Sequence, residues 1–442
     1  MIDEQYFDNL VTAATAKLTG DEVLLATAQT ESTDFARFNN AQVRQAGSVD
    51  QTTINLDLIA GQRHTEASLQ LCSEQQVDDA RVLAVLERLR EQRAVVPDDP
   101  HLIINTEPVS THHVGENRLP ERDDALAAIT KGAAGRDLVG IYTAGGVASA
   151  FANSLGQRNW FETSTFNFDW TFYLRADKAV KSAYAGFGWE QPVFDRKLSD
   201  ASAKLEALSR DPIDLKPGEY RSYLTPAALH EVIDLLAWNA FSARAQQTSQ
   251  SSLLQLLTGE GELDPAIKIS EDTANGVAPN FQEQGFMRPD EVRLIENGKP
   301  VDALVSPRSA VEFDLTPNGA SGYESPNSLA IAGGELNVDD AIAELGTGLY
   351  IGNLWYTNFS DRPACRVTGM TRFATFWVEG GEIVAPVNVL RFDDTIYNML
   401  GERLSALSAE PEFVFDNSTY SQRSSGSVRL PGALLEGMRF TL

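Results

Sequence analysis

The residues best suited to chemistry stand at the start of an expected helix, where His230 is followed by Glu231. A metal ion that activates water needs about three protein ligands, and two histidines on one helix face commonly supply two of them. The chain has 5 histidines, and His230 is the only one after His113. A two-histidine helix therefore cannot form in the C-terminal half. Glu231 is favourable there for a structural reason, because it lies near the positive end of the helix dipole.

Other reactive side chains lack the neighbours that their chemistry requires. Cys365 stands alone among apolar residues and is expected to pack in the core. His112 and His113 are adjacent in a proline-rich stretch without a further ligand, which is typical of solvated histidines. The segment 319–322 lacks the spacing of a nucleophile elbow, and Gly145-Gly146 lacks that of a dinucleotide-binding loop. We therefore predict neither a catalytic residue nor a metal ligand in this chain.

One segment has a composition that suits the binding of an extended peptide. Leu349–Arg362 is rich in aromatic and amide side chains, and such a strand can pair with an extended peptide by strand addition. Because side chains alternate along a strand, about half of these aromatics are expected to fill a core instead. The candidates for lining a peptide channel are Tyr350, Asn353, Tyr356, Asn358 and Arg362.

Length and composition limit the classes of protein to consider. The 442 residues suit two or three domains, and a hydrophobic content of 43% supports a sizeable core. No apolar run is long enough to span a membrane, and the acidic start Met1–Glu4 does not resemble a signal peptide. A net charge of −26 argues against a nucleic-acid groove. Cys72 and Cys365 lie in different candidate domains, which fits a reducing cytoplasm.

The first half alternates between helical and strand patterns. Apolar residues at helical spacing predict an amphipathic helix over 1–20, and period-two alternation then predicts an antiparallel meander. Phe166, Phe168, Trp170 and Phe172 alternate with polar residues, which indicates a long half-buried strand. The expected strands are Val23–Gln29, Phe35–Arg44, Thr53–Ile59, Thr65–Leu71 and several within 138–188. The expected helices are Val77–Arg93, Asp123–Lys131 and Leu198–Ser209. The segment 96–121 is expected to be loop.

A change of composition near residues 210–217 divides the chain. Asp211-Pro212 and Lys216-Pro217 interrupt any regular element, so we predict domains at 1–212 and 213–442. The second domain is expected to contain one clear helix, from Pro226 to about Arg244, and otherwise mostly strands. Asn297-Gly298 and Gly380-Gly381 each separate two apolar runs and predict hairpins.

Several stretches, in order, resemble the TldD/PmbA family. The run 35–45 resembles its "TRFANNxIxQ" strand pair, and Gly140–Gly146 with Ala152–Gly156 resembles its "GxY…ANSxG" segment. Gly348–Ile351, Thr368-Gly369 and Phe376–Ile383 resemble its "TG…GFWVENGEI" signature. The order and spacing of these pieces over roughly 35–400 make the resemblance specific.

The resemblance implies an α+β protein. Its N-terminal α/β domain would carry an antiparallel sheet, and its C-terminal domain would be mostly antiparallel β, like a barrel or sandwich, around one helix. It also implies two-subunit particles that enclose a cavity. TldD-type subunits bind a metal through a His-Glu-x-x-x-His helix and a later cysteine and cleave unfolded peptides, whereas TldE (PmbA) subunits lack those ligands.

This sequence departs from the catalytic pattern at each ligand. Leu235 stands five residues after His230, where the second histidine is expected, and a register shifted to Asp234–Asn239 contains no histidine. Thr368-Gly369 replaces the family's Cys-Gly. Cys365 lies three residues upstream, a spacing that in a strand points its side chain to the opposite face.

The leading hypothesis is therefore a non-catalytic, TldE-like subunit without a cofactor of its own. It would pair with a TldD-type paralogue that carries zinc and would help to hold an unfolded peptide in the cytoplasm. Two alternatives stay open. One is a stand-alone peptidase with an unrecognised site, which a loss of activity on mutation of Glu231 would support, and the other is a homodimeric peptide-binding or scaffold protein. Neither nucleic acid nor membrane is an expected partner, although the family name "modulator of DNA gyrase" mentions gyrase.

Overall fold

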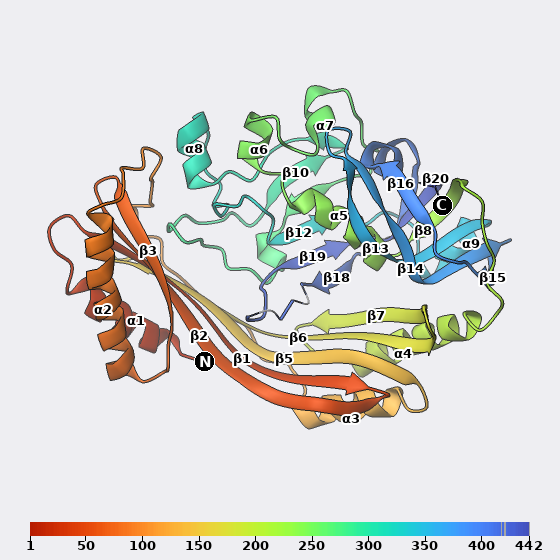
Figure 1. Ribbon diagram of the computed structural model, residues 1–442, viewed down its shortest axis with the longest axis horizontal. Coiled ribbons are helices and arrows are strands. Elements are labelled where there is room, and N and C mark those ends of the chain that lie inside the picture. The colour runs from red at the N-terminus through yellow and green to blue at the C-terminus, as the bar shows by residue number, and fades with distance from the viewer. Residues whose placement is uncertain (417, 420, 442) are drawn as a thin grey trace.

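Three β-sheets organise the computed structural model, which describes residues 1–416, 418–419 and 421–441 (Figure 1). The first sheet has the order β3-β2-β1-β5-β6-β4, and β7 pairs with β6 beside β4. Its strands are antiparallel, except that β4 runs parallel to β6. The bounds are β1 Val23–Asn39, β2 Gln42–Ala60, β3 Arg63–Gln70, β4 Thr111–Val114, β5 Asp137–Asn153, β6 Arg158–Arg175 and β7 Lys178–Gly186.

The predicted antiparallel meander is confirmed, but three long strands replace the four expected ones, because Phe35–Arg44 is divided between the end of β1 and the start of β2. Asn40 and Ala41, at φ 51° and 56°, make the turn between β1 and β2, and Gly61 at φ 58° makes the next turn. The prediction that 96–121 is entirely loop is wrong, since β4 forms within it. This four-residue strand carries His112 and His113 and has no alternating apolar pattern to reveal it.

Two pairs of helices cover the first sheet. The first pair, α1 (Glu4–Thr15) and α2 (Gln75–Arg93), packs on apolar side chains of β1, β2 and β5. The second pair, α3 (Arg122–Gly132) and α4 (Gln191–Ala207), covers the other end of the sheet (Figure 1). All four helices overlap with the expected ones, and the expected helix over 1–20 ends earlier, at Thr15.

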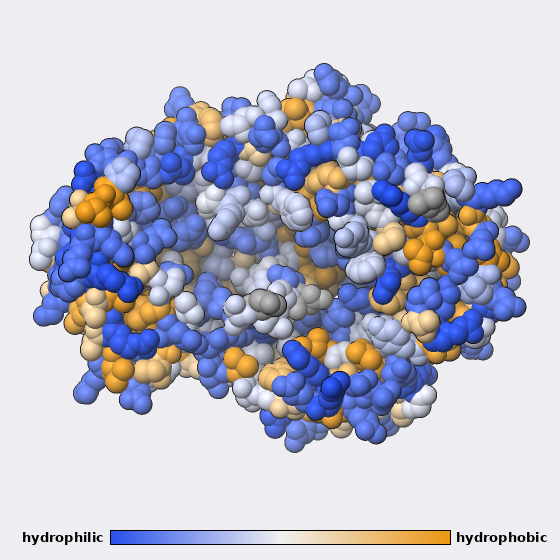
Figure 2. All heavy atoms as spheres, in the orientation of Figure 1, coloured by the Kyte–Doolittle hydropathy of each residue, from blue (hydrophilic) through white to orange (hydrophobic). Residues whose placement is uncertain are grey.

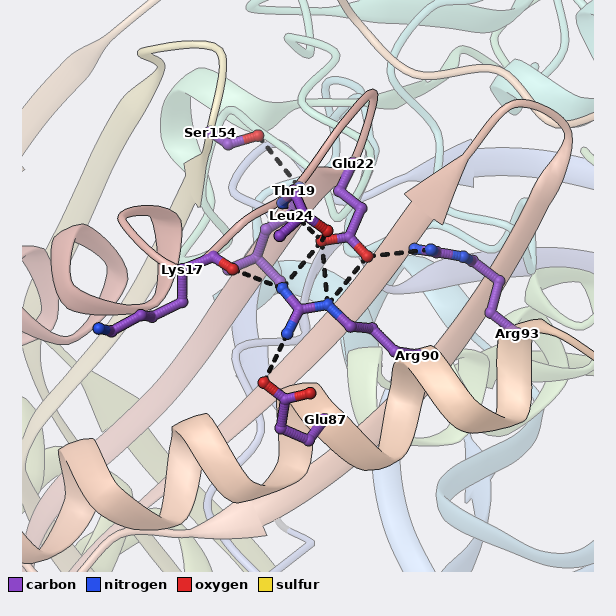
Figure 3. A network of polar contacts seen from close by, with 8 residues as sticks. All are labelled: Lys17, Thr19, Glu22, Leu24, Glu87, Arg90, Arg93 and Ser154. Carbon is purple, nitrogen blue, oxygen red and sulfur yellow. Dashed lines mark hydrogen bonds and ion pairs between the residues drawn. The ribbon is translucent and has the colours of Figure 1, made fainter.

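A buried carboxylate fixes α2 to the chain that leads into β1 (Figure 3). Glu22 is 3% exposed and forms ion pairs of 2.9 Å with both Arg90 and Arg93. Arg90 also donates to the Lys17 carbonyl at 2.6 Å. Burial alone would raise the pKa of Glu22, but hydrogen bonds from Arg90, the Thr19 N–H and Arg93 outweigh it and lower the pKa to about 2.

Helix α4 packs on β6 and β7 of the first sheet and also contacts the later strand Glu382–Pro386. The aromatic stripe of β6 is fully buried, as its alternation predicts, and Phe194 of α4 packs on Phe168 and Trp170. At the far end of α4, Lys204 pairs with Asp200 at 2.6 Å and lies 5.0 Å from the centre of the Tyr350 ring. One apolar core therefore joins residues from both halves of the chain.

The other two sheets use strands after residue 217. The second has the order β11-β10-β9-β12-β19-β18. The third has the order β13-β8-β20-β16-β14-β15, and pairing of β13 with β14 closes it into a barrel, while β17 pairs with β20. The bounds are β8 Gly218–Leu224, β9 Ile269–Glu271, β10 Val292–Glu296, β11 Lys299–Pro300, β12 Ser328–Ile331, β13 Gly348–Asp361, β14 Arg366–Glu379, β15 Glu382–Pro386, β16 Arg391–Thr395, β17 Leu404–Leu407, β18 Glu412–Phe415, β19 Ser427–Leu430 and β20 Ala433–Phe440.

The C-terminal half differs from its prediction in its helices. Helix α5 ends at Ala237 rather than near Arg244, because Ser242 caps a separate helix by accepting from the Ala245 N–H at 3.1 Å. Both predicted hairpins form, at Asn297-Gly298 and at Gly380-Gly381, with positive φ at all four residues. The additional helices are α6 Ala243–Gln247, α7 Leu254–Thr258, α8 Pro307–Phe313 and α9 Ala341–Leu345, with a π-helix at Asn398–Glu402 and 3-10 turns at Thr273–Asn275 and Val338–Asp340.

The fold is α+β with mostly antiparallel sheets. Parallel pairs also occur between β12 and β19 and between β13 and β8. The proposed domain division after residue 212 falls in the segment between α4 and β8. Among the described residues, none of the helices combines the length and the apolar character that crossing a membrane requires.

Candidate functional site

Helix α5 has one face in the C-terminal core and a second, less buried face. Thr225 begins it, because its hydroxyl accepts from the Ala228 N–H at 3.2 Å, and Pro226 suits the first turn. Val232 and Ile233 on the core face are fully buried. The less buried face is formed by residues at helical spacing, namely Ala227, His230, Glu231, Asp234 and Trp238.

Burial and nearby charges shift the pKa values of the side chains on the less buried face of α5. His230 is half-buried, and burial lowers the pKa of its imidazole below the ordinary value. Asp234 opposes this shift, whereas Lys181 of β7 reinforces it. Burial also raises the pKa of Glu231, against the effect of Lys181. His230 and Glu231 therefore lie in a partly desolvated space between α5 and β7.

Five residues after His230, where a two-histidine helix would carry its second ligand, this chain has a core side chain. Leu235 is 3% exposed and packs with the apolar face of α5. In the shifted register the positions are Asp234 and Asn239, and Asn239 lies beyond the helix and donates to the Gln250 carbonyl at 2.9 Å. In the part of the chain that the structure describes, no two other metal-binding side chains lie within coordination reach of His230. The donor set around α5 does not fit a zinc ion.

The cysteine position offers no ligand either. Cys365 lies in the turn between β13 and β14 rather than in a strand, with φ of 45°, and its side chain is buried. The prediction that it packs in the core is confirmed. Burial raises the pKa of its thiol to about 12, so the metal-binding thiolate is disfavoured. Thr368 donates to the Phe392 carbonyl at 2.8 Å and accepts from Arg391 at 3.3 Å.

The five peptide-channel candidates separate into two groups. Tyr350 and Asn353 are buried, at 5% and 7% exposure. The Tyr350 ring packs on Tyr223 and Phe376 in the core that joins the two halves, so it does not line an open channel. Tyr356 and Asn358 are exposed along the outer part of β13, and Arg362 is exposed in the turn that follows it. Beyond Ile351 this strand pairs with β14 on one side, whereas its pairing with β8 is confined to 349–351.

The molecule is hollowed between the first sheet and the C-terminal sheets, and hydrophilic residues predominate around the hollow (Figure 2). A small cavity of about 10 Å³, room for about one water molecule, lies on this side of the first sheet. It is lined by polar side chains of β1 and β5, such as Gln29, Glu31 and Ser149, and by Val277 and Arg423 of the C-terminal half.

Arg423 connects the C-terminal half to the floor of this cavity. Its guanidinium donates to the Gly145 carbonyl at 3.2 Å and to the Thr165 carbonyl at 3.1 Å, and its backbone N–H donates to Glu31 at 3.3 Å. Burial lowers the pKa of Arg423 to about 10. The sequence alone does not mark Arg423 as functional, since its only signal is a lone arginine in the serine-rich connection between β18 and β19.

The sequence of the second half identifies the family. The profile of the PmbA/TldA metallopeptidase C-terminal domain matches residues 217–442, slightly more than half of the chain. The chain belongs to the PmbA/TldD family. Its resemblance to this family in the sequence is thereby confirmed. Among curated protein sequences, none matches significantly.

Solved structures of PmbA/TldD-like proteins share the fold. TldE from Thermococcus kodakarensis superposes with a TM-score of 0.78 at 15% identity, over 99% of this chain and 100% of that one. A putative modulator of a DNA gyrase from Thermotoga maritima gives 0.74 at 15% identity, over 99% and 100%. A putative modulator of DNA gyrase from Bacteroides thetaiotaomicron gives 0.75 at 15% identity, over 100% of both chains. At this identity the similarity establishes the fold alone.

Proposed function

We propose that the chain is a non-catalytic, TldE-like subunit of a cytoplasmic peptidase and pairs with a TldD-type paralogue that carries the zinc ion. The observation that supports this most directly is α5. The second turn of the helix carries His230 and Glu231 in the space beside β7, but Leu235 of the same helix packs in the core, and no other ligands surround His230 among the described residues. A helix in this position can shape a chamber without activating water.

The proposed role in binding is to hold an unfolded peptide in an extended form. Tyr356 and Asn358 present an aromatic ring and an amide on β13, and Arg362 adds a positive charge in the turn after this strand. Next to them the Arg372 guanidinium lies 4.4 Å from the centre of the exposed Trp355 ring. The outer part of β13 pairs on one side only, so its other edge can accept main-chain hydrogen bonds from a peptide.

Residues of the hollow would add selectivity. Glu31 is 5% exposed and accepts from the Thr33 hydroxyl at 2.9 Å and from the Arg423 N–H. With Gln29 and Ser149, it gives the cavity a polar floor with fixed geometry. Such a floor suits the main-chain amides of a peptide better than an apolar ligand.

Assembly is the property to test for this proposal. The chain and a TldD-type paralogue from the same genome are purified separately, mixed, and examined by size-exclusion chromatography with light scattering. We expect a complex that contains both chains. A stable homodimer that ignores the paralogue would contradict the proposal and favour the stand-alone binding or scaffold protein.

A further inference from the structure

A cluster of metal-binding side chains lies in the N-terminal half, on the hairpin of β2 and β3. Asp57, His64 and Glu66 each offer a ligand atom, and these atoms all lie within 4.8 Å of one another. Within the described residues, this is the only group of three or more such side chains with that geometry. It is separate from α5 in the sequence and in the fold, and the proposed function makes no use of it.

The register of the hairpin explains how the three side chains meet. Asp57 pairs directly with Glu66 across the two strands, and His64 pairs with Ile59. Thr65 points to the other face, where its hydroxyl donates to the Leu89 carbonyl of α2 at 2.9 Å. Because side chains alternate, His64 and Glu66 share the face away from α2, and Asp57 joins them from the neighbouring strand.

The distances fit one common ion. His64 Nδ1 lies 3.1 Å from both carboxylate oxygens of Asp57 and 3.8 Å from Glu66 Oε1. Two ligand atoms bound to zinc at about 2.1 Å, in tetrahedral geometry, are about 3.4 Å apart. The observed separations lie on either side of that value, so small side-chain rotations would place all three ligands around one cation.

The two carboxylates give this point a negative charge. They lie directly opposite each other across the sheet, an arrangement that a positive charge between them stabilises. Either a protonated His64 or a bound metal ion can supply that charge, because the Asp57 hydrogen bond raises the pKa of His64. A third carboxylate, Asp99, lies 4.0 Å from Nε2 on the other side of the His64 ring. Its own charge is compensated by Arg308 of α8 at 2.6 Å. At 4.0 Å Asp99 makes no hydrogen bond to Nε2. A closer approach would give His64 the carboxylate partner that a metal-binding histidine commonly has at its other ring nitrogen.

We propose that Asp57, His64 and Glu66 form a binding site for a divalent first-row metal ion of the zinc type, which binds His64 through Nδ1. One imidazole and two carboxylates suit such an ion better than calcium or magnesium, which prefer oxygen ligands throughout. Asp57 and His64 are 16% and 30% exposed, whereas Glu66 is 68% exposed, so the site is open to solvent on one side. Through Asp99 and Arg308 the ion would be connected to the C-terminal half.

The test is zinc binding by the full chain. Chelator-treated protein is titrated with zinc chloride by isothermal calorimetry, and we expect one site. His64→Ala and Glu66→Gln should each weaken binding by about tenfold or more. Glu66→Gln changes an exposed side chain and preserves its shape, which guards against an effect of misfolding. Circular dichroism of each variant checks that the fold is intact.

Two histidine variants serve as controls. His112→Ala removes another histidine–carboxylate pair, with Glu4 at 3.0 Å, that has no further ligand. His230→Ala removes the histidine of α5. Both variants should bind zinc like the wild type. A chain that binds no zinc, or zinc binding that survives His64→Ala and Glu66→Gln, would overturn the proposal. Loss of binding in His230→Ala alone would place the ion at α5 and contradict the proposed function instead.

Discussion

His230 and Leu235 lie on different faces of α5, although a metal-binding helix of the TldD type would need both positions for the same ion. The His230 imidazole is half-buried in the space beside β7, whereas Leu235 is 3% exposed in the C-terminal core. At the second ligand position this chain therefore has a core side chain. A histidine placed there would disturb the core rather than build a site.

This relationship predicts the effect of Leu235→His. Burying an imidazole in place of an apolar side chain should lower the free energy of unfolding by about 2–4 kcal/mol without creating zinc binding at α5. Urea denaturation and zinc titration measure the two quantities. Asp234→Asn, one residue earlier on the exposed face, is the control and should change stability by about 0.5 kcal/mol or less. A histidine is not used at this position, because it would lie one helical turn from His230 and give a pair of zinc ligands. A stable Leu235→His variant that gains a zinc ion would contradict our reading of α5.

The buried position of Tyr350 predicts a loss of stability. Tyr350→Ala should cost about 3–5 kcal/mol, because it removes a large ring from the core that joins the two halves. Tyr356 is 77% exposed, so Tyr356→Ala should leave stability within about 0.5 kcal/mol and weaken the binding of an unfolded peptide. Urea denaturation and fluorescence anisotropy with a labelled peptide test the pair. Equal stability of the two variants would refute this assignment.

The ion pairs of Glu22 predict a dependence of stability on pH. The pKa of Glu22 falls from its ordinary value of 4.5 to about 2 in the folded chain. The resulting stabilisation, about 3 kcal/mol, is therefore present above pH 4.5 and is lost as the pH falls from there toward about 2. Urea denaturation over this range should show a shallower loss of stability for Glu22→Gln than for the wild type.

A second glutamate provides the control for that experiment. Glu87 also contacts Arg90, at 2.7 Å, but its side chain is 69% exposed. Glu87→Gln should change stability by about 1 kcal/mol at most and keep the pH dependence of the wild type. If both variants behaved alike, the desolvated contacts of Glu22 would not be the cause.

The two cysteines should differ in reactivity. Cys72 is exposed, whereas Cys365 is buried and its thiol has a raised pKa. A thiol reagent should therefore modify Cys72 in the folded chain and both cysteines after denaturation. Mass spectrometry of the modified peptides measures this. Rapid modification of Cys365 in the folded chain would show that its turn opens.

Much of the fold follows from local patterns in the sequence. The alternation around Phe168 and the turn residues Asn297-Gly298 specify β6 and the β10–β11 hairpin without help from distant residues. The end of α5 could not be predicted in this way. The helical pattern continues past Ala237, and the capping hydrogen bond of Ser242 decides where the next helix begins.

The sequence alone predicts the missing second histidine of the candidate site, but it does not predict which distant residues surround the site. The count of histidines sufficed to exclude a two-histidine helix. The contacts of Arg423 with Gly145 and Thr165 join residues more than 250 positions apart, and no local pattern signals them. The meeting of Asp57 with His64 depends on the register of a hairpin, which alternation alone leaves open.

The central claim is that this chain supports peptide hydrolysis only in partnership. The most direct test measures hydrolysis of an unfolded peptide by the chain alone, by a TldD-type paralogue alone and by the mixture, with and without a chelator. We expect no hydrolysis by the chain alone, and we expect chelator-sensitive hydrolysis by the mixture. Hydrolysis by the chain alone that is abolished by Glu231→Gln would contradict the account and establish a peptidase in its own right.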